Sequence, residues 1–197
     1  MRLVLASGSP RRRALLETLR LDFEVDPSKV DEARLPDEAP AVYVERVARS
    51  KAGFSAAPGR LVVAADTTVV HQGRVMGKPA HPEEARAMLR RLQGETHEVL
   101  TGLAVAWWDE GPSIQSIVDV SMVEMVPMTE DEIAEYVATG EPMDKAGAYA
   151  LQGMGGVFVR RVIGSPFTVI GLPIHLLDRL MSSGGAGLTH FRLPATR

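Results

Sequence analysis

Apolar runs alternate with amphipathic stretches along the first third of the chain. Leu3–Ala6 is apolar throughout and predicts a strand, and residues 10–19 carry leucines along one face of a predicted helix that Ser9 can cap. Residues 41–56 show the same helical spacing, and the apolar run Leu61–Ala65 predicts a second buried strand. If the two strands are parallel neighbours, the residues that follow them leave the sheet at the same edge.

The later part of the chain predicts a long hairpin and amphipathic helices that look structural. Residues 97–108 and 114–126 predict two antiparallel strands. One helix is predicted from Pro82 to Leu92, and another begins at Thr129, which forms a capping-box pattern with Glu132. These elements predict a scaffold and bring no candidate chemistry of their own.

The predicted helix at residues 10–19 begins with an unfavourable run of positive charge. Arg11, Arg12 and Arg13 fill its first turn, where the helix dipole disfavours cations by about 0.3–1 kcal/mol each. Arg12 heads the apolar face and Arg11 borders it, whereas Arg13 can pair with Glu17 on the solvent side. Helix N-termini and guanidinium groups both bind phosphate. Ser7, Arg11 and Arg12 therefore predict an oxyanion cradle, and a solvated basic turn remains the alternative.

Other charged residues stand where they could meet that anion. Lys51 continues the apolar face of the helix at 41–56, where a lysine either reaches the surface or binds an anion. Asp66 follows the second buried strand, where an unpaired carboxylate costs free energy, although an aspartate that simply starts a turn is the alternative. Glu32 lies in a polar loop, where acidic residues are usually just solvated, and it could hold a divalent ion beside a phosphate only if that loop folds back over the cradle. Lys78 is on a loop and is better placed for a ligand than charges on helices.

Composition narrows the class of protein. The 197 residues are 45% hydrophobic, enough to bury the core of one domain or of two closely joined lobes. A net charge of −3 argues against a wide nucleic-acid-binding face. The chain has no cysteine, which excludes thiol nucleophiles and Cys-bound zinc and fits a cytoplasmic location. The N-terminus leads directly into a short strand with no signal-peptide apolar region, and no apolar run approaches roughly 20 residues, so we expect neither export nor a membrane span.

Residues 141–156 combine small residues with a few polar ones. Alanines and glycines surround Asp144, Lys145 and Gln152 and would let the backbone approach a ligand closely. The stretch matches neither the phosphate-binding P-loop nor the dinucleotide-binding fingerprint.

Six short motifs, in order over residues 3–180, resemble the Maf family of nucleoside triphosphate pyrophosphatases. They are Leu5-Ala6-Ser7-Gly8-Ser9-Pro10-Arg11-Arg12, Arg49-Ser50-Lys51-Ala52, Ala65-Asp66-Thr67, Gly77-Lys78-Pro79, His97-Glu98-Val99-Leu100-Thr101-Gly102, and Asp144-Lys145-Ala146-Gly147-Ala148-Tyr149 with Leu151-Gln152-Gly153. The resemblance implies an α/β fold: an elongated mixed sheet flanked by helices, in two lobes with a central cleft, similar to inosine triphosphate pyrophosphatases. We expect one catalytic domain over residues 1–182 and a mobile tail over 183–197.

The resemblance also implies an activity and roles for single residues. Family members hydrolyse a nucleoside triphosphate to the monophosphate and pyrophosphate with a divalent cation, Mg²⁺, Mn²⁺ or Co²⁺. The family's proton acceptor falls on Asp66, and its three positions for base choice fall on Arg11, Thr67 and Gln152. A branch that looks specific for 7-methylguanosine triphosphate typically has Gln after this aspartate, so Thr67 favours dTTP and UTP.

The expected chemistry agrees with the charged residues found above. Cutting between the α and β phosphorus atoms requires positioning a water molecule and neutralising phosphate charge. Arg12, Lys51 and Lys78 would neutralise that charge, Glu32 and Asp66 would hold the metal, and Asp66 would activate the water. Ser7 would belong to the phosphate cradle.

The remaining expectations concern an alternative function and the partners. The family is linked to septation, so a nucleotide-binding regulator of septum formation that does not turn its ligand over remains an alternative. The predicted hairpin has edges at which two subunits could pair as a homodimer. We expect a nucleotide as the ligand, with no nucleic acid and no membrane.

Overall fold

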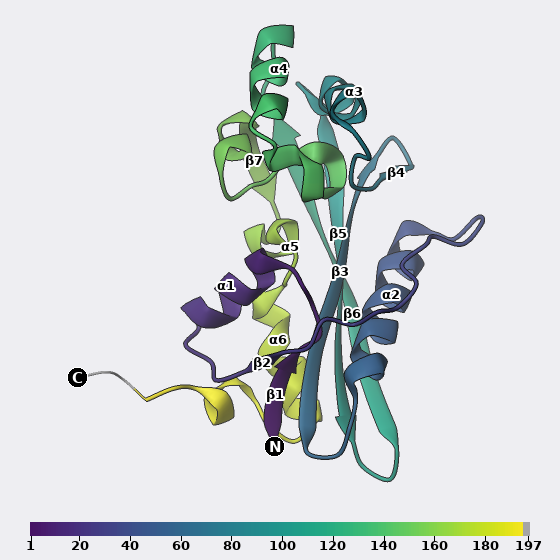
Figure 1. Cartoon of the computed structure of the whole chain (residues 1–197), viewed down its shortest axis with the longest axis vertical. Helices are drawn as coiled ribbons and strands as arrows, with labels where there is room; N and C mark the ends of the chain where they lie inside the picture. The colour runs from purple at the N-terminus through teal and green to yellow at the C-terminus, as the bar shows by residue number, and fades with distance from the viewer. Residues whose placement is uncertain (195–197) are drawn as a thin grey trace. The chain divides into compact units, whose positions relative to one another are not determined.

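A computed structural model describes residues 1–194 of the protein, which contains a mixed sheet flanked by helices (Figure 1). The strands are β1 (Arg2–Leu5), β2 (Glu24–Val25), β3 (Arg60–His71), β4 (Arg74–Met76), β5 (Thr96–Trp108), β6 (Pro112–Met125) and β7 (Val159–Ile163). The α-helices are α1 (Pro10–Thr18), α2 (Pro40–Ser55), α3 (Pro82–Leu92), α4 (Glu130–Ala138), α5 (Pro166–Ile170) and α6 (Ile174–Ser183). Short 3₁₀ helices are η1 (Glu141–Asp144), η2 (Ala146–Ala148), η3 (Met154–Phe158) and η4 (Leu188–Phe191). The predicted α/β class is confirmed.

The strand order is β2-β1-β3-β5-β6-β7, with β4 paired to β3. β1 is parallel to both β2 and β3, and Leu5 lies opposite Val63. The predicted parallel pair is therefore confirmed. Antiparallel pairing joins β3 to β4 and β6 to β7. In this order β5 lies between β3 and β6, and β6 lies between β5 and β7. The outermost strands are therefore β2 and β7, and not the two strands of the predicted hairpin.

One predicted boundary is wrong, because Asp66 does not end its strand. β3 continues through Asp66 to His71, since the β-branched residues Thr67 to Val70 suit a strand and pair onward with β4. β1, in contrast, ends at Leu5. Asp66 thus lies within β3, beyond the last residue of its parallel neighbour.

The chain divides into two compact units. Unit 1 comprises residues 1–66, 101–119 and the chain from 171 onward, and unit 2 comprises residues 67–100 and 120–170. Strands β3, β5 and β6 contribute residues to both units. The predicted central cleft stays a prediction.

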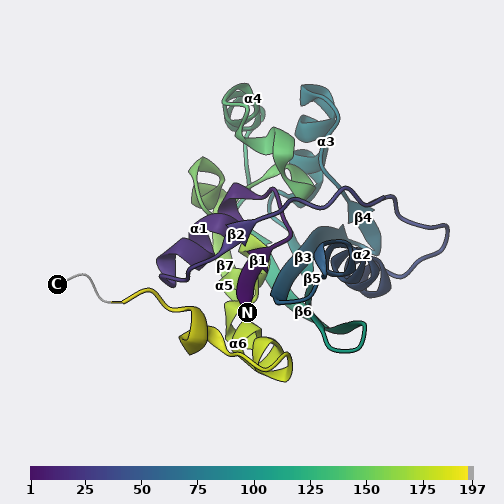
Figure 2. The ribbon, with the colours of Figure 1, turned by 60° about the horizontal axis from the view of Figure 1, so that its bottom comes forward.

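Unit 1 has helices on both sides of its strands. Figures 1 and 2 show α2 on one side and α1 and α6 on the other. Small side chains of α2 contact the strands, and this cluster contains Val4, Ala6, Ala48, Ala52, Val62, Ala64, Ala104 and Ala106. Because these side chains are small, α2 approaches the sheet closely.

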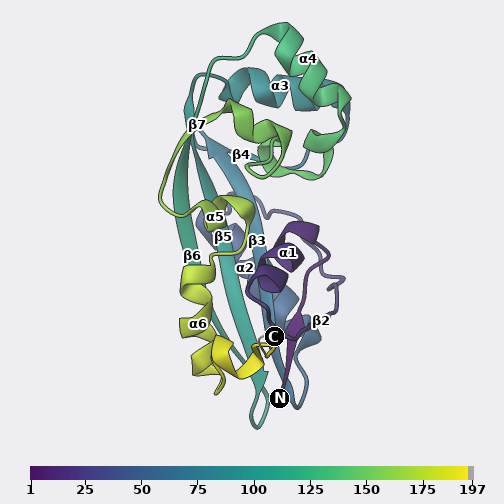
Figure 3. The ribbon, with the colours of Figure 1, turned by 90° about the vertical axis from the view of Figure 1, so that its left-hand side faces the viewer.

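Unit 2 is built around α3 and α4, which lie side by side (Figure 3). α4 begins with the predicted capping box of Thr129 and Glu132. The fully buried Leu89 and Leu92 of α3 and Ile133 of α4 belong to one apolar cluster with strand residues.

Within residues 1–194, no helix has both the length and the apolar character needed to cross a membrane.

The segment predicted as a mobile tail makes contacts in unit 1 as far as it is described. Phe191 of η4 is buried, and its carbonyl accepts a hydrogen bond from the N–H of Asp22 at 2.7 Å. The N–H of Leu193 donates to the carbonyl of Arg20 at 2.7 Å. Its mobility stays a prediction, and residues 195–197 lie outside the described part of the chain.

Candidate functional site

Arg12 is buried at the start of α1, as the predicted cradle requires. Its Nη1 donates to Ser7 Oγ at 3.0 Å, and its Nε donates to the carbonyl of Gly171 at 2.7 Å. Ser9 occupies the N-cap position, but within residues 1–194 its side chain makes no capping bond, so that prediction is wrong. Its backbone N–H instead donates to Ser7 Oγ at 3.2 Å. Ser7 therefore organises both the turn and the arginine.

Lys51 lies between two carboxylates. Its Nζ is 2.8 Å from Asp66 Oδ1 and 2.9 Å from Glu32 Oε2, and only 7% of its side chain is exposed. The lysine on the apolar face of α2 therefore meets anionic groups of the protein itself. Two ion pairs offset the desolvation of the buried ammonium group, and removal of both would leave a buried charge uncompensated.

The loop that carries Glu32 folds back onto α2. The hydroxyl of Tyr43 donates to the Glu32 carbonyl at 3.0 Å, and Arg46 Nη2 donates to the carbonyl of Ala33 at 2.9 Å. Arg46 also binds the buried Glu38 through Nε and Nη2, at 2.6 and 2.9 Å. The hydrogen bond from Arg46 lowers the pKa of Glu38 to about 2, so the ion pair of Arg46 with Glu38 persists well below neutral pH. The carboxylate of Glu32 thereby reaches Lys51 and acts on the pKa of Arg12 in the predicted cradle, and its role in holding a metal stays a prediction.

The charges of α1, α2 and β3 in unit 1 interact with one another. Burial lowers the pKa of Arg12, and Arg11 lowers it further, whereas the carboxylates of Asp66 and Glu32 raise it. An arginine stays protonated throughout the physiological range, so Arg12 is a buried cation beside two carboxylates. Burial and the same two carboxylates raise the pKa of Tyr43. Unit 1 thus brings together Ser7, Arg11, Arg12, Glu32, Lys51 and Asp66.

Two carboxylates facing one ammonium group could also hold a divalent cation. Within residues 1–194 there is no cluster of three or more acidic, histidine or cysteine side chains suited to a metal ion. Mg²⁺ is commonly bound through one or two carboxylates together with the phosphates of a substrate. Glu32 and Asp66 fit that pattern, because both are oxygen donors and converge on one point, the Nζ of Lys51.

The remaining predicted residues belong to unit 2. Thr67 is half-buried and directly follows Asp66, whereas Lys78 and Gln152 are exposed. The carbonyl of Gly77, next to Lys78, accepts a hydrogen bond from the N–H of Gly147 at 3.1 Å. The predicted lysine loop therefore contacts, at Gly147, the small-residue segment 141–156 that also carries Gln152.

Two residues that contact the charged group of unit 1 were not predicted from the sequence. Gly171 holds Arg12 through its backbone carbonyl, a group present in every residue, so no sequence signal could have identified it. Tyr43 could have been found, because it precedes Lys51 by eight residues and so lies on a similar face of α2.

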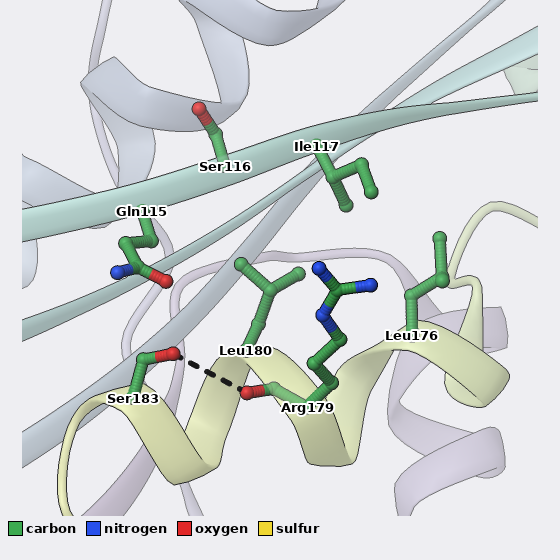
Figure 4. A pocket seen from close by; sticks show the side chains of 7 residues that line it. All are labelled: Gln115, Ser116, Ile117, Leu176, Arg179, Leu180 and Ser183. Atoms are coloured by element: carbon green, nitrogen blue, oxygen red, sulfur yellow. Dashed lines mark hydrogen bonds between the residues drawn. The ribbon is translucent and has the colours of Figure 1, made fainter.

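A separate pocket of about 130 Å³ lies between β6 and α6 in unit 1 (Figure 4). Its lining consists of Gln115, Ser116, Ile117, Leu176, Arg179, Leu180 and Ser183. These are not the residues predicted for the site, so the pocket does not enter the candidate chemistry.

Known proteins resemble this chain over most of its length. A family model described as Maf-like protein matches residues 2–183. A dTTP/UTP pyrophosphatase of Anaeromyxobacter dehalogenans (strain 2CP-C) is 50% identical over 185 residues, which cover 93% of this chain and 94% of the relative. A protein of the same name from Pectobacterium atrosepticum is 47% identical over 187 residues, with 93% of each chain covered.

One solved structure has a weaker likeness. The HAM1 protein from Coxiella burnetii has a TM-score of 0.44 and 18% identity, covering 75% of this chain and 86% of that one.

Proposed function

The chain belongs to the Maf family, and from this premise we propose that it hydrolyses nucleoside triphosphates, dTTP and UTP by preference, to the monophosphate and pyrophosphate. Relatives that are 47–50% identical over more than nine-tenths of the chain carry the name dTTP/UTP pyrophosphatase. Such an enzyme removes unwanted or non-standard nucleotides from the cell. The observation that most supports this function is the group of buried charges Arg12, Lys51 and Asp66 in unit 1.

Each charged residue of unit 1 has a proposed task in this reaction. Arg12 and Arg11 bind phosphate oxygens, with the Ser7 hydroxyl keeping the Arg12 fork in place. Lys51 neutralises charge on the triphosphate and holds the two carboxylates near each other. Asp66 orients and deprotonates the attacking water, a role typically worth roughly 10²–10⁴-fold in rate.

Glu32 and Asp66 are the residues that would hold a divalent cation, Mg²⁺, Mn²⁺ or Co²⁺. Such an ion, when bound, supplies charge neutralisation at the phosphates and lowers the pKa of a bound water. The carboxylate of Glu32 is half exposed, so it can exchange Lys51 for another cation more readily than the buried Asp66 can.

Residues of unit 2 are proposed to recognise the substrate. By resemblance, Thr67 and Gln152 take part in the choice of base together with Arg11, and Lys78 neutralises phosphate charge. Lys78 and Gln152 are exposed on loops, as residues that contact a ligand need to be. A homodimer and a cytoplasmic location remain expectations beside this function.

The products of dTTP hydrolysis in water enriched with ¹⁸O test this proposal. With Mg²⁺ present, we expect equal amounts of dTMP and pyrophosphate, with the label in dTMP because water attacks the α-phosphorus. Excess chelator should abolish turnover, and dGTP should be a poorer substrate than dTTP. Orthophosphate with dTDP would contradict the cleavage site. A rise in melting temperature with dTTP but no cleavage would favour a nucleotide-sensing regulator.

A further inference from the structure

The backbone before Gln152 is held by a buried tyrosine of α4. Tyr136 is 2% exposed, and its hydroxyl oxygen accepts a hydrogen bond from the N–H of Ala150 at 3.2 Å. The same hydroxyl donates its proton to Oε1 of Glu141 at 2.8 Å. Tyr136 therefore links the loop at residues 150–155, which carries Gln152, to the carboxylate of Glu141 at the start of η1.

The backbone after Gln152 is held by that carboxylate. Glu141 Oε2 accepts the N–H of Met154 at 3.0 Å, and its Oε1 accepts the N–H of Gly155 at 2.9 Å. Both oxygens of one side chain are thus used on the first turn of η3. Hydrogen bonds to a charged acceptor are roughly twice as strong as neutral ones, so this is a firm attachment.

The loop is in direct contact with both side chains. Gly153 has φ +128°, and a Cβ there would lie 2.5 Å from Glu141 Oε2. A Cβ at Gly155 would lie 2.3 Å from the hydroxyl oxygen of Tyr136. Glycine is therefore required at both positions, because any side chain would displace the loop from its supports.

Glu141 remains a carboxylate in this setting. Burial raises its pKa, but hydrogen bonds from Gly155, Tyr136 and Met154 outweigh that effect, and the pKa is lowered overall. Gln152 itself is exposed, so its polar side chain is accessible to a ligand. The backbone is held by hydrogen bonds both before and after this residue. Such preorganisation is what accurate recognition of a ligand needs.

We propose that Glu141 and Tyr136 are positioning residues for base selection. They fix the backbone on either side of Gln152, so that the Gln152 side chain meets the pyrimidine base in one orientation. This inference rests on the proposed function, in which Gln152 takes part in the choice of base. Neither side chain needs to touch the nucleotide for this role.

Kinetics with dTTP and dGTP test the role in the full-length protein. Glu141→Gln leaves one acceptor oxygen and places an amide donor against a backbone N–H, so one support is lost. We expect the ratio of kcat/KM for dTTP over dGTP to fall by about tenfold, chiefly through KM for dTTP. Tyr136→Phe removes the acceptor for the Ala150 N–H and should lower the same ratio. Both variants should still release pyrophosphate.

Two comparisons separate positioning from a general loss of stability. Glu132→Gln alters another carboxylate that accepts a backbone N–H, that of Thr129 at the start of α4, and should leave the ratio unchanged. In a Gln152→Ala background, Glu141→Gln should lower the ratio no further, because the positioned side chain is already absent.

The outcomes are distinct. Equal losses for dTTP and dGTP in both variants, or an unchanged ratio with an active wild type, would overturn the positioning role and leave the proposed function standing. A further tenfold fall in the Gln152→Ala background would also overturn it. A wild-type protein that releases no pyrophosphate from any nucleoside triphosphate would overturn the proposed function and this inference together.

Discussion

At the scale of single residues, the candidate site depends on one buried ammonium group with two unequal partners. Asp66 is nearly as buried as Lys51, whereas half of the Glu32 side chain is exposed. An exposed carboxylate can leave for a metal ion or for water at little cost, but a buried one cannot. The structure therefore favours Asp66 as the fixed group of the pair and Glu32 as the adaptable one.

Asp66→Asn should lower kcat for dTTP by at least about tenfold while the protein remains folded. The amide cannot accept a proton from water, yet its oxygen can still accept the hydrogen bond from Lys51, and Glu32 keeps a charge beside that ammonium. Steady-state rates and circular dichroism measure the two effects. The matched control is Asp26→Asn, which removes another ion-paired carboxylate of unit 1, the partner of Arg60 at 3.0 Å. Wild-type turnover in Asp66→Asn would exclude Asp66 as the base.

At the scale of elements, α2 and β5 approach each other so closely that their contact demands glycine. A Cβ at Gly102 would lie 2.3 Å from the carbonyl oxygen of Val44 and 2.9 Å from the N–H nitrogen of Glu45. These are backbone atoms inside a helix and cannot move independently of it. The motif that ends in Gly102 thus sets the distance between β5 and the helix that carries Lys51.

Gly102→Ala should lower the free energy of unfolding by about 2 kcal/mol, because overfilling a tight contact forces the backbone apart. Urea unfolding followed by circular dichroism measures the change. Gly111→Ala, in the turn of the same hairpin, is the matched control, since among the described residues a Cβ there would have no heavy atom within 4 Å apart from those of Gly111 and its two chain neighbours. Similar stabilities for the two variants would show that α2 can yield at this point.

At the scale of the whole molecule, unit 2 contains a buried histidine whose titration is coupled to folding. Nε2 of His97 is 2.8 Å from the hydroxyl oxygen of Tyr149, and its Nδ1 is buried with no hydrogen-bond partner among residues 1–194. Burial, and then the neighbouring His71, lower the pKa of His97 to about 4 from an ordinary value of 6.5. The folded state therefore keeps this ring neutral in a range where the unfolded chain binds a proton.

Stability should fall as the pH drops from 6.5 to about 4, because the unfolded state takes up the proton first. Proton uptake by the unfolded chain should lower the unfolding free energy by about 3 kcal/mol between pH 6.5 and pH 4, whereas well above pH 6.5 His97 is neutral in both states and has no such effect. Urea unfolding at several pH values measures it. His97→Gln should flatten this dependence, whereas His190→Gln, at an exposed position, should leave it as in the wild type. An equally steep dependence in His97→Gln would assign the effect to other groups.

Much of the fold and part of the site could be predicted from the sequence. The capping box at Thr129 and the ion pair of Arg13 with Glu17 are local patterns, and both are confirmed. The parallel pairing of β1 with β3 joins distant residues, yet it was predicted from two buried apolar runs and is also confirmed. The end of β3 was misplaced, because a polar aspartate inside a strand looks like the start of a turn until its partner is known. The supports of Gln152 were missed, since they join residues 136 and 141 to backbone groups that no pattern marks.

The sequence by itself determined the family, the succession of strands and helices along the chain, and which charged residues could carry chemistry. Spacing and residue type are properties of the chain itself. Only the tertiary structure decided that Lys51 faces Asp66 and Glu32, that Ser7 and a backbone carbonyl hold Arg12, and that Glu141 and Tyr136 hold the Gln152 loop. The physical reason is that such contacts join residues far apart in the chain and often involve backbone groups. Their geometry exists only after helices and strands have packed together.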